Sequence, residues 1–304
     1  MMKSVKNNLN FLKIFFDRGD FLGVDGEVYK TKKGELSILV QKFQILGKAI
    51  RPLPEKWHGI KDTESRYRQR YLDLIMNDKV WEVFQFRSKF IRSLREFYWQ
   101  EGFEEVETPT FTHMATGATA TPYVTHNHAL DIDVYLRISH EIPLKELIIG
   151  GYEKIFELGK AFRNEGFDHS HLPEHTHLEH YCAYWNFEDN IKFTEKLFNY
   201  LLTNLDLSPK MTLLDKNEKI QKVDWSTPWP RVNFIELIKK DTGLDIMEYN
   251  QADDLRKVIK KVKINFEGIN DMSLAGLVDN LYKKVSRPKI IQPTILYHYP
   301  KYCS

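Results

Sequence analysis

The chain has little cysteine, no long apolar run and almost no excess charge. Its two cysteines among 304 residues, Cys182 and Cys303, exclude a disulfide framework and fit a reducing cytoplasm. No stretch is apolar enough to span a membrane, and FLKIFF at residues 11–16 is too short, and interrupted by Lys13, for a signal-peptide core. With 44 basic and 42 acidic residues, the net charge of +2 does not demand a nucleic-acid partner but permits a local basic patch.

The order of the expected elements favours an α+β fold. Residues 21–50 read as short strands with a turn at 31–34, and residues 81–99 carry apolar side chains at helical spacing. Further strands are expected at 103–108, 122–138, 152–161 and 290–297, and further helices at 66–75, 141–147, 191–205 and across most of 231–286. Because no βαβ phosphate fingerprint is present, we expect a mainly antiparallel sheet with helices packed on it.

The run FRNEGFDHSHLPEHTHLEHY at residues 162–181 is the most informative part of the sequence. It predicts the end of one strand, a polar loop and a second strand. Arg163 at the base of the loop suits bidentate binding of phosphate or carboxylate, and Glu165 shares its face if the strand persists that far. The alternative is a surface hairpin in which Arg163 and Glu165 only pair with each other.

Three segments resemble the class II aminoacyl-tRNA synthetases, and the lysyl branch is the most similar. FRNEG, with the following loop and LExY, resembles motif 2, and GFEEVETPTF at 102–111 resembles motif 1, which implies a homodimer interface with Pro109 at its turn. TGATATPYVTHNHALDIDVYLRISHE at 116–141 is similar to the amino-acid-binding region. The resemblance implies two domains: a partial OB-type anticodon-binding barrel at 1–54, and a class II catalytic domain, truncated at its C-terminus, at 55–304.

The reaction that this resemblance implies is ATP-dependent activation of lysine to lysyl-adenylate, followed by transfer to tRNA(Lys). Such chemistry depends on positioning and charge neutralisation more than on a protein nucleophile. Arg163 matches the family arginine that contacts the α-phosphate and the lysine carboxylate, and Glu165 is the second expected catalytic residue. The residues implied at the ATP site are Arg163, Glu165, His171 and His175.

The residues that the resemblance implies around lysine are Gly117, Glu141, Glu179 and Tyr181. Glu141 matches the acid that receives the ε-ammonium group, and a carboxylate with a hydroxyl is a suitable pair for selecting a cation. Each has a simpler alternative. Glu141 could only begin a helix, Gly117 could be only a turn glycine, and Glu179 and Tyr181 could form an exposed cross-strand pair.

Five histidines crowd the same segment: His169, His171, His175, His177 and His180. Their spacing makes a metal site conceivable, but the matching family loop binds nucleotide, so we expect no metal there. Mg²⁺ is expected to accompany ATP, with its acidic ligands beyond residue 304.

The sequence departs from the family pattern at both ends and at single residues. Strands from Phe21 onward would expose unpaired edges. The last glycine is Gly276, so the glycine-rich motif 3 is absent; we expect little aminoacylation by this chain alone and a final strand at 290–297 without its sheet neighbours. Thr121 stands where many members carry arginine, and the sequence alone does not determine the effect of this change.

Two other functions stay open. An aspartyl or asparaginyl enzyme shares the architecture, but Glu141 argues against it because a pocket for an acidic substrate requires a cation. A non-catalytic synthetase-like protein that binds RNA or a protein partner would fit the loss of both ends. Such a binding module has no need of the retained set of Arg163, Glu165, Glu141, Glu179 and Tyr181.

His175 stands where the family usually has a phenylalanine that stacks on adenine. An imidazole can also stack, but it titrates near neutral pH. We therefore expect nucleotide affinity to change with pH more than in a relative with phenylalanine. Calorimetric titration with ATP between about pH 5.5 and 8, either side of a free imidazole at about 6.5, measures this, and equal affinity across that range would contradict it.

Overall fold

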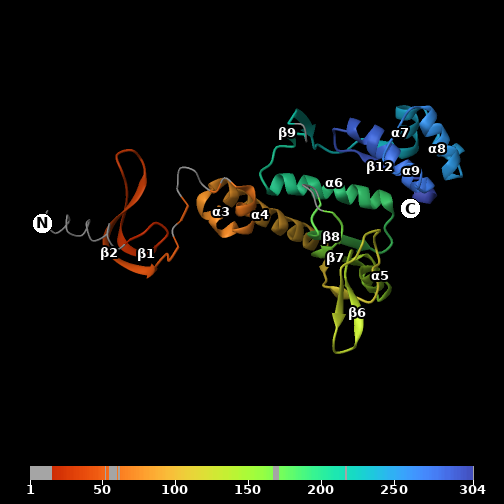
Figure 1. The fold of residues 1–304 in the computed structure, drawn as a ribbon. Helices are drawn as coiled ribbons and strands as arrows, with labels where there is room; N and C mark the ends of the chain where they lie inside the picture. Colours follow the sequence, from red (N-terminus) through yellow and green to blue (C-terminus); the bar gives the residue numbers. More distant parts are fainter. Residues whose placement is uncertain are drawn as a thin grey trace. The chain divides into compact units, whose positions relative to one another are not determined.

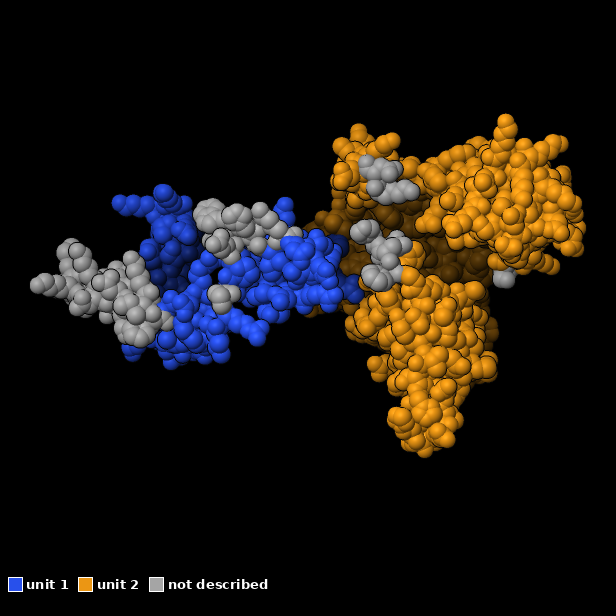
Figure 2. All heavy atoms as spheres, in the orientation of Figure 1, with its two compact units in different colours: residues 1–88 blue, residues 89–304 orange. Residues whose placement is uncertain are grey.

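The computed structural model describes residues 16–51, 53–54, 60, 62–166, 171–215 and 218–303. His169 lies outside the described residues. The chain forms two compact units, residues 1–88 and 89–304, which Figure 2 colours separately. The boundary falls inside helix α4 (Asp78–Gln100), so the expected domain boundary at residue 54 stays a prediction.

The first unit contains a long β-hairpin followed by short helices. Its elements are β1 (Phe21–Lys30), β2 (Leu36–Gly47), α2 (Thr63–Arg68), α3 (Arg70–Met76) and the first part of α4. The Gly34 N–H donates to the Thr31 carbonyl at 2.8 Å, which confirms the predicted turn. Many large apolar side chains of the hairpin are exposed, and closure into an OB-type barrel is not shown and stays a prediction.

The second unit mixes helices with small sheets (Figure 1). Its elements are β3 (Glu104–Glu105), β4 (Phe111–Thr112), β5 (Val124–Asn127), β6 (Ile132–Leu136), α5 (Glu141–Ile149), β7 (Lys154–Phe162), β8 (Glu174–Cys182), α6 (Phe187–Asn204), β9 (Lys210–Leu214), β10 (Ile220–Asp224), β11 (Arg231–Asn233), α7 (Phe234–Thr242), α8 (Ala252–Lys261), α9 (Leu274–Leu281) and β12 (Ile295–Tyr297), with short turns of 3₁₀ or π helix at Ile246–Glu248, Tyr282–Ser286, Arg287–Lys289 and Lys301–Cys303. Most strand pairs are antiparallel, as expected; β3–β7 and β11–β12 are parallel.

Helices α4 and α6 pack on one face of the sheet β3–β7–β8 (Figure 1). Tyr98 of α4 stacks on Phe156 of β7 with ring centroids 4.6 Å apart, and Phe193 of α6 lies 5.4 Å from Tyr98. Burying a large apolar side chain contributes about 1.5–3 kcal/mol. The apolar periodicity of α4 predicted this face correctly at Phe90, Leu94 and Phe97. It was wrong for Val83 and Phe86, which are exposed.

Two of the expected strands are shorter than predicted. The strand expected at 103–108 is reduced to Glu104–Glu105, because the backbone N–H of Thr108 donates to the Glu157 carboxylate at 3.2 Å instead of continuing the ladder. The strand expected at 290–297 is reduced to β12. That strand pairs with β11, so the expectation that it lacks a neighbour was wrong. The hairpin β9–β10 was not predicted at all.

The other face of β7 carries a buried polar group. Glu157 is buried and bridged by Arg137, and the Thr108 hydroxyl donates to Glu157 Oε2 at 2.6 Å. Arg137 Nε also donates to the Lys160 carbonyl at 2.8 Å. Gly159 leaves the space for this arrangement, because an added Cβ would lie 2.5 Å from Arg137 Nη2.

Replacing Gly159 by alanine therefore forces Arg137 off Glu157. We expect a loss of about 1–3 kcal/mol in the free energy of unfolding, the usual cost of overpacking, measured by urea denaturation. Gly166→Ala is the matched control, since its added Cβ meets nothing within 4 Å. Equal stability of the two variants would show that Arg137 can move at no cost.

Candidate active site

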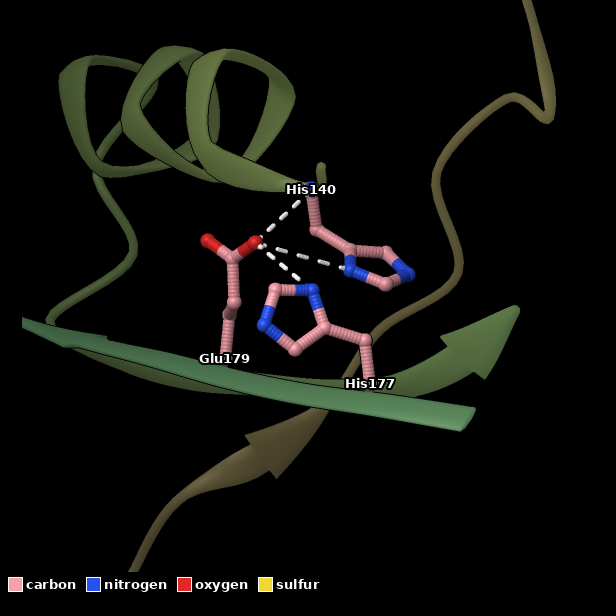
Figure 3. Close-up of side chains that lie close together, drawn as sticks. All are labelled: His140, His177 and Glu179. Carbon is pink, nitrogen blue, oxygen red and sulfur yellow. Dashed lines mark hydrogen bonds and ion pairs between the residues drawn. The ribbon is translucent and has the colours of Figure 1, made fainter. Parts of the chain in front are cut away.

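Strand β8 sorts its side chains onto two faces, as strand alternation requires. Leu178 and Cys182 pack against the aromatic core between α4 and α6, and His180 lies there too. His177 and Glu179 point to the opposite face, where the start of α5 lies (Figure 3). The candidate site is built on this second face.

The four residues expected at the ATP site surround one cavity of about 260 Å³. It is lined by Arg163, Glu165, Gly166, His171, Leu172 and His175. The structure thus brings together the residues of the loop after β7 and the start of strand β8. A cavity of this size with a cation at its wall suits part of an anionic ligand.

Arg163 lies in the loop just past the end of β7, not on the strand itself. Its backbone N–H donates to the Pro173 carbonyl at 2.8 Å, which closes the base of the loop. Its Nε atom is buried and has no hydrogen-bond partner. Glu165 accepts a hydrogen bond from the Thr121 N–H at 3.3 Å, and the described contacts include no ion pair between Arg163 and Glu165. The simple hairpin pairing is therefore not what the structure shows.

Ser139 links the residues expected around lysine. Its hydroxyl donates to Glu179 Oε1 at 2.6 Å and accepts the Glu141 N–H at 3.1 Å. The Tyr181 hydroxyl lies 3.4 Å from Glu179 Oε2. Gly117 has a φ of +86°, and an added Cβ would lie 3.0 Å from both Ser139 Oγ and Glu141 Cβ. Gly117 is thus required by its close approach as well as by its backbone angle.

Glu141 begins α5, and its backbone N–H donates to Ser139 in this group. Its role at the ε-ammonium group of lysine stays a prediction. Lys145, one turn along the helix, places its Nζ 2.6 Å from Glu141 Oε1. The same ammonium group lies 5.9 Å from the centre of the Tyr181 ring. The alkylammonium group of Lys145 therefore lies near both the Glu141 carboxylate and the Tyr181 ring.

Glu179 is held in its ionised form. Burial by itself would raise its pKa, but hydrogen bonds from His140 and Ser139 outweigh burial and lower the pKa to about 2. The His140 N–H, which donates to Glu179 Oε1 at 3.0 Å, lies at the N-terminus of α5, where the helix dipole also favours a negative charge. Burial, with the charges of Glu179 and Glu141, raises the pKa of Tyr181, so its hydroxyl stays protonated.

Two imidazoles surround the Glu179 carboxylate (Figure 3). Oε1 of Glu179 lies 3.3 Å from His177 Nδ1 and 3.7 Å from His140 Nδ1. His140 is completely buried, and its Nε2 lies 3.6 Å from Glu157 Oε1. Burial lowers the pKa of His177. None of these ring nitrogens (His140 Nδ1 and Nε2, His177 Nδ1) has a hydrogen-bond partner.

The histidine cluster is therefore not one site. His171 and His175 line the cavity beside Arg163, and His177 lies beside Glu179. His180 is structural, because its Nδ1 lies 2.8 Å from the Tyr98 hydroxyl and its Nε2 lies 2.9 Å from Asn190 Oδ1.

Pro109 is exposed and lies at a separate cavity of about 300 Å³. Residues of β4 and α5, with Ser139 and Arg137, complete its lining. Contact of Pro109 with a second copy of the chain stays a prediction.

Comparisons with known proteins show the family of the chain. Residues 62–303 match the family model described as tRNA synthetases class II (D, K and N). The chain belongs to the class II tRNA synthetases. Its similarity to the lysyl branch, first seen in FRNEG and the neighbouring motifs, is confirmed by the curated relatives.

Three lysine–tRNA ligases show how far the similarity extends. This synthetase chain is 42% identical over 300 residues to that of Aquifex aeolicus, covering 98% of this chain and 49% of the relative. The ligase of Fervidobacterium nodosum is 44% identical over 298 residues (98% and 57%), and that of Pelotomaculum thermopropionicum 43% over 284 residues (93% and 55%). The chain spans about half the length of these relatives.

Four residues of the candidate site were not predicted from the sequence: Arg137, Ser139, His140 and Glu157. Three of them lie in YLRISHE, a string that signalled the family but whose single residues gave no sign of their contacts. Glu157 sits in a strand that reads as apolar. Its place in the site becomes clear only from the strand register, in which Glu157 lies opposite Glu179.

The lowered pKa of Glu179 predicts a dependence of stability on acid pH. Its ionised form stabilises the fold above the ordinary pKa of 4.5, and this contribution is lost as pH falls through about 2. Glu179→Gln should remove that component of the acid unfolding curve, followed by circular dichroism. Glu174→Gln, on the same strand and paired with Lys160 at the surface, should retain it; an unchanged curve in Glu179→Gln would contradict the prediction.

Proposed function

We propose that the chain carries the lysine- and ATP-binding part of a lysine–tRNA ligase, which activates lysine to lysyl-adenylate and transfers it to tRNA(Lys). The arrangement of β8 supports this most directly. His175 at the nucleotide cavity and Glu179 in the carboxylate group lie on one strand face, four residues or about 13 Å apart. That spacing suits a ligand with a nucleotide at one end and an amino acid at the other.

Arg163 is the residue we assign to the reacting phosphate. When the lysine carboxylate attacks the α-phosphate of ATP and pyrophosphate leaves, negative charge grows on the phosphate oxygens. A guanidinium whose Nε is buried and without a partner is preorganised to neutralise that charge. Glu165, His171 and His175 are assigned to the nucleotide on the strength of the shared cavity.

Lysine is selected by two carboxylates. Glu179 would hold the α-ammonium group and Glu141 the ε-ammonium group, with Gly117 and Tyr181 shaping the pocket between them. The contact of Lys145 with Glu141 at 2.6 Å supports this assignment, because it places an alkylammonium group on the same carboxylate. A neutral or acidic side chain could not replace Lys145 as the partner of Glu141, whereas the ε-ammonium group of lysine could. This disfavours aspartate and asparagine as substrates.

Mg²⁺ would accompany ATP and neutralise its phosphates. The three-residue ligand group found within the described residues is His140, His177 and Glu179. Two imidazoles do not suit Mg²⁺, which prefers oxygen ligands, so we do not assign this group to Mg²⁺.

Three further assignments rest on the family. The chain would form a homodimer through the region of α4 and Pro109, bind the anticodon with residues 1–54 as part of an OB-type barrel, and work in the cytoplasm. Exposed Trp81, Val83 and Phe86 on α4 support the first. Among the described helices, none combines the length and the apolar character needed to cross a bilayer.

Thermal stabilisation by a non-hydrolysable lysyl-adenylate mimic tests the function. Binding is the better readout because the chain spans about half the length of its relatives. We expect the lysyl mimic to raise the melting temperature and the aspartyl mimic to leave it unchanged. Glu141→Gln should weaken binding roughly ten- to a hundredfold, since a hydrogen bond to a charged group contributes about 1.5–3 kcal/mol.

Glu146→Gln is the matched control, because it removes an exposed carboxylate from the same helix. It should bind the lysyl mimic as tightly as the unchanged chain. Equal loss in both variants, or equal stabilisation by the aspartyl mimic, would rule out the assignment of Glu141.

A further inference from the structure

The amino-acid pocket contains three side chains arranged as ligands of a metal ion (Figure 3). One donor atom from each of His140, His177 and Glu179 lies within 4.8 Å of the other two. Glu179 Oε1 is 3.3 Å from His177 Nδ1 and 3.7 Å from His140 Nδ1. Tetrahedral coordination with bonds of about 2.0–2.2 Å places ligand atoms roughly 3.3–3.6 Å apart. The side chains are therefore close to the required geometry.

The two imidazole nitrogens approach Glu179 without making a hydrogen bond. Nδ1 of His140 and Nδ1 of His177 are both buried without a hydrogen-bond partner, and His140 is completely buried. Orphaned buried polar atoms are rare and call for an explanation. A bound cation would satisfy both nitrogens at once.

The surroundings supply the supporting contacts of a metal ligand. Nε2 of His140 faces Glu157 Oε1 at 3.6 Å; a proton on Nε2 leaves the Nδ1 lone pair facing Glu179. A histidine between a carboxylate and a metal is a recurrent arrangement that orients the ring. Ser139 and the His140 N–H hold Glu179 Oε1 in place, and an ionised carboxylate still has lone pairs to spare.

We infer that His140, His177 and Glu179 form a binding site for a divalent transition metal, with Zn²⁺ as the preferred ion. Two imidazoles and one carboxylate with an open fourth position are a set that Zn²⁺ accepts, whereas Mg²⁺ and Ca²⁺ prefer oxygen ligands alone. The site is distinct from the nucleotide cavity and from any Mg²⁺ that accompanies ATP.

The position of the site gives it a consequence that rests on the proposed function. Glu179 is the carboxylate assigned to the α-ammonium group of lysine. A bound dication neutralises this carboxylate and repels the ammonium, so Zn²⁺ and lysine exclude each other. Zinc would then act as an inhibitor that competes with the amino acid and leaves the nucleotide cavity untouched.

The first test uses Co²⁺ as a spectroscopic substitute for Zn²⁺, with the whole chain and no lysine present. We expect one equivalent of Co²⁺ to give the intense visible absorption of a tetrahedral site, and Zn²⁺ to displace it. His177→Gln should weaken binding at least about tenfold, since loss of even a supporting contact costs ten- to a hundredfold. His177 is half-buried and has no hydrogen bond at Nδ1 to lose, so the variant should fold, and its metal-free melting temperature checks this.

His126→Gln is the matched control. His126 lies on the hairpin β5–β6, 3.0 Å from Asp133 and 3.3 Å from Asp131, and is a histidine with two carboxylates nearby on the surface. Its variant should bind Co²⁺ as the unchanged chain does. A spectrum of octahedral Co²⁺ alone would overturn the proposal. So would a loss of Co²⁺ binding in His126→Gln with no loss in His177→Gln.

The second test measures the affinity of the lysyl-adenylate mimic with Zn²⁺ and with a chelator. We expect at least tenfold weaker binding with Zn²⁺ in the unchanged chain and no effect of Zn²⁺ in His177→Gln. Equal or tighter binding with Zn²⁺ would overturn the competition. If the mimic fails to bind even with the chelator, the proposed function fails, while the cobalt titration still decides the metal site.

Discussion

Two glutamates face each other across neighbouring strands, and the site depends on how their repulsion is relieved. Glu157 of β7 and Glu179 of β8 are direct partners in the antiparallel register, and like charges in such a pair are destabilising. Arg137 bridges Glu157, while His140 places one ring nitrogen toward each carboxylate. Gly159 leaves room for both. The last residues of YLRISHE are therefore what allow two acids to lie under one helix.

The two faces of β8 have different roles: one packs against the aromatic core, and the other carries the residues of the candidate site. The aromatic core of α4 and α6 fixes the even-numbered residues, including His180 through Tyr98 and Asn190. Because alternation is strict, His175, His177, Glu179 and Tyr181 are then aimed at α5 and the loop after β7. A register slip of one residue would turn Glu179 toward the aromatic core. The packing of that core therefore also determines which side chains of β8 face the candidate site.

The sequence predicted elements better than it predicted contacts. The periodicity of α4, the alternation of β7 and β8, and the turn near Gly34 are local signals, and the structure contains all three. The short β3 and β12 were overestimated because an apolar run does not show where a backbone N–H leaves the ladder for a side chain, as it does at Thr108. Arg137, His140 and Glu157 were missed because their significance lies in register between segments some 20 to 40 residues apart. The resemblance brought Glu141, Glu179 and Gly117 into view, and Ser139 is the contact that joins them.

The two facing glutamates also differ in what they can do. Glu157 accepts hydrogen bonds from Thr108 and Arg137 and has only 2% of its side chain exposed, so its charge is already neutralised. The contacts of Glu179 among the described residues include no arginine, and 14% of its side chain is exposed, yet His140, Ser139, the nearby His177 and the N-terminus of α5 keep it ionised. A buried ion pair is costly to break, whereas a carboxylate stabilised by hydroxyl and amide groups keeps its full negative charge. Of the pair, therefore, Glu157 holds the architecture and Glu179 is the one left with a charge for a ligand to neutralise, whether that ligand is an ammonium group or a metal ion.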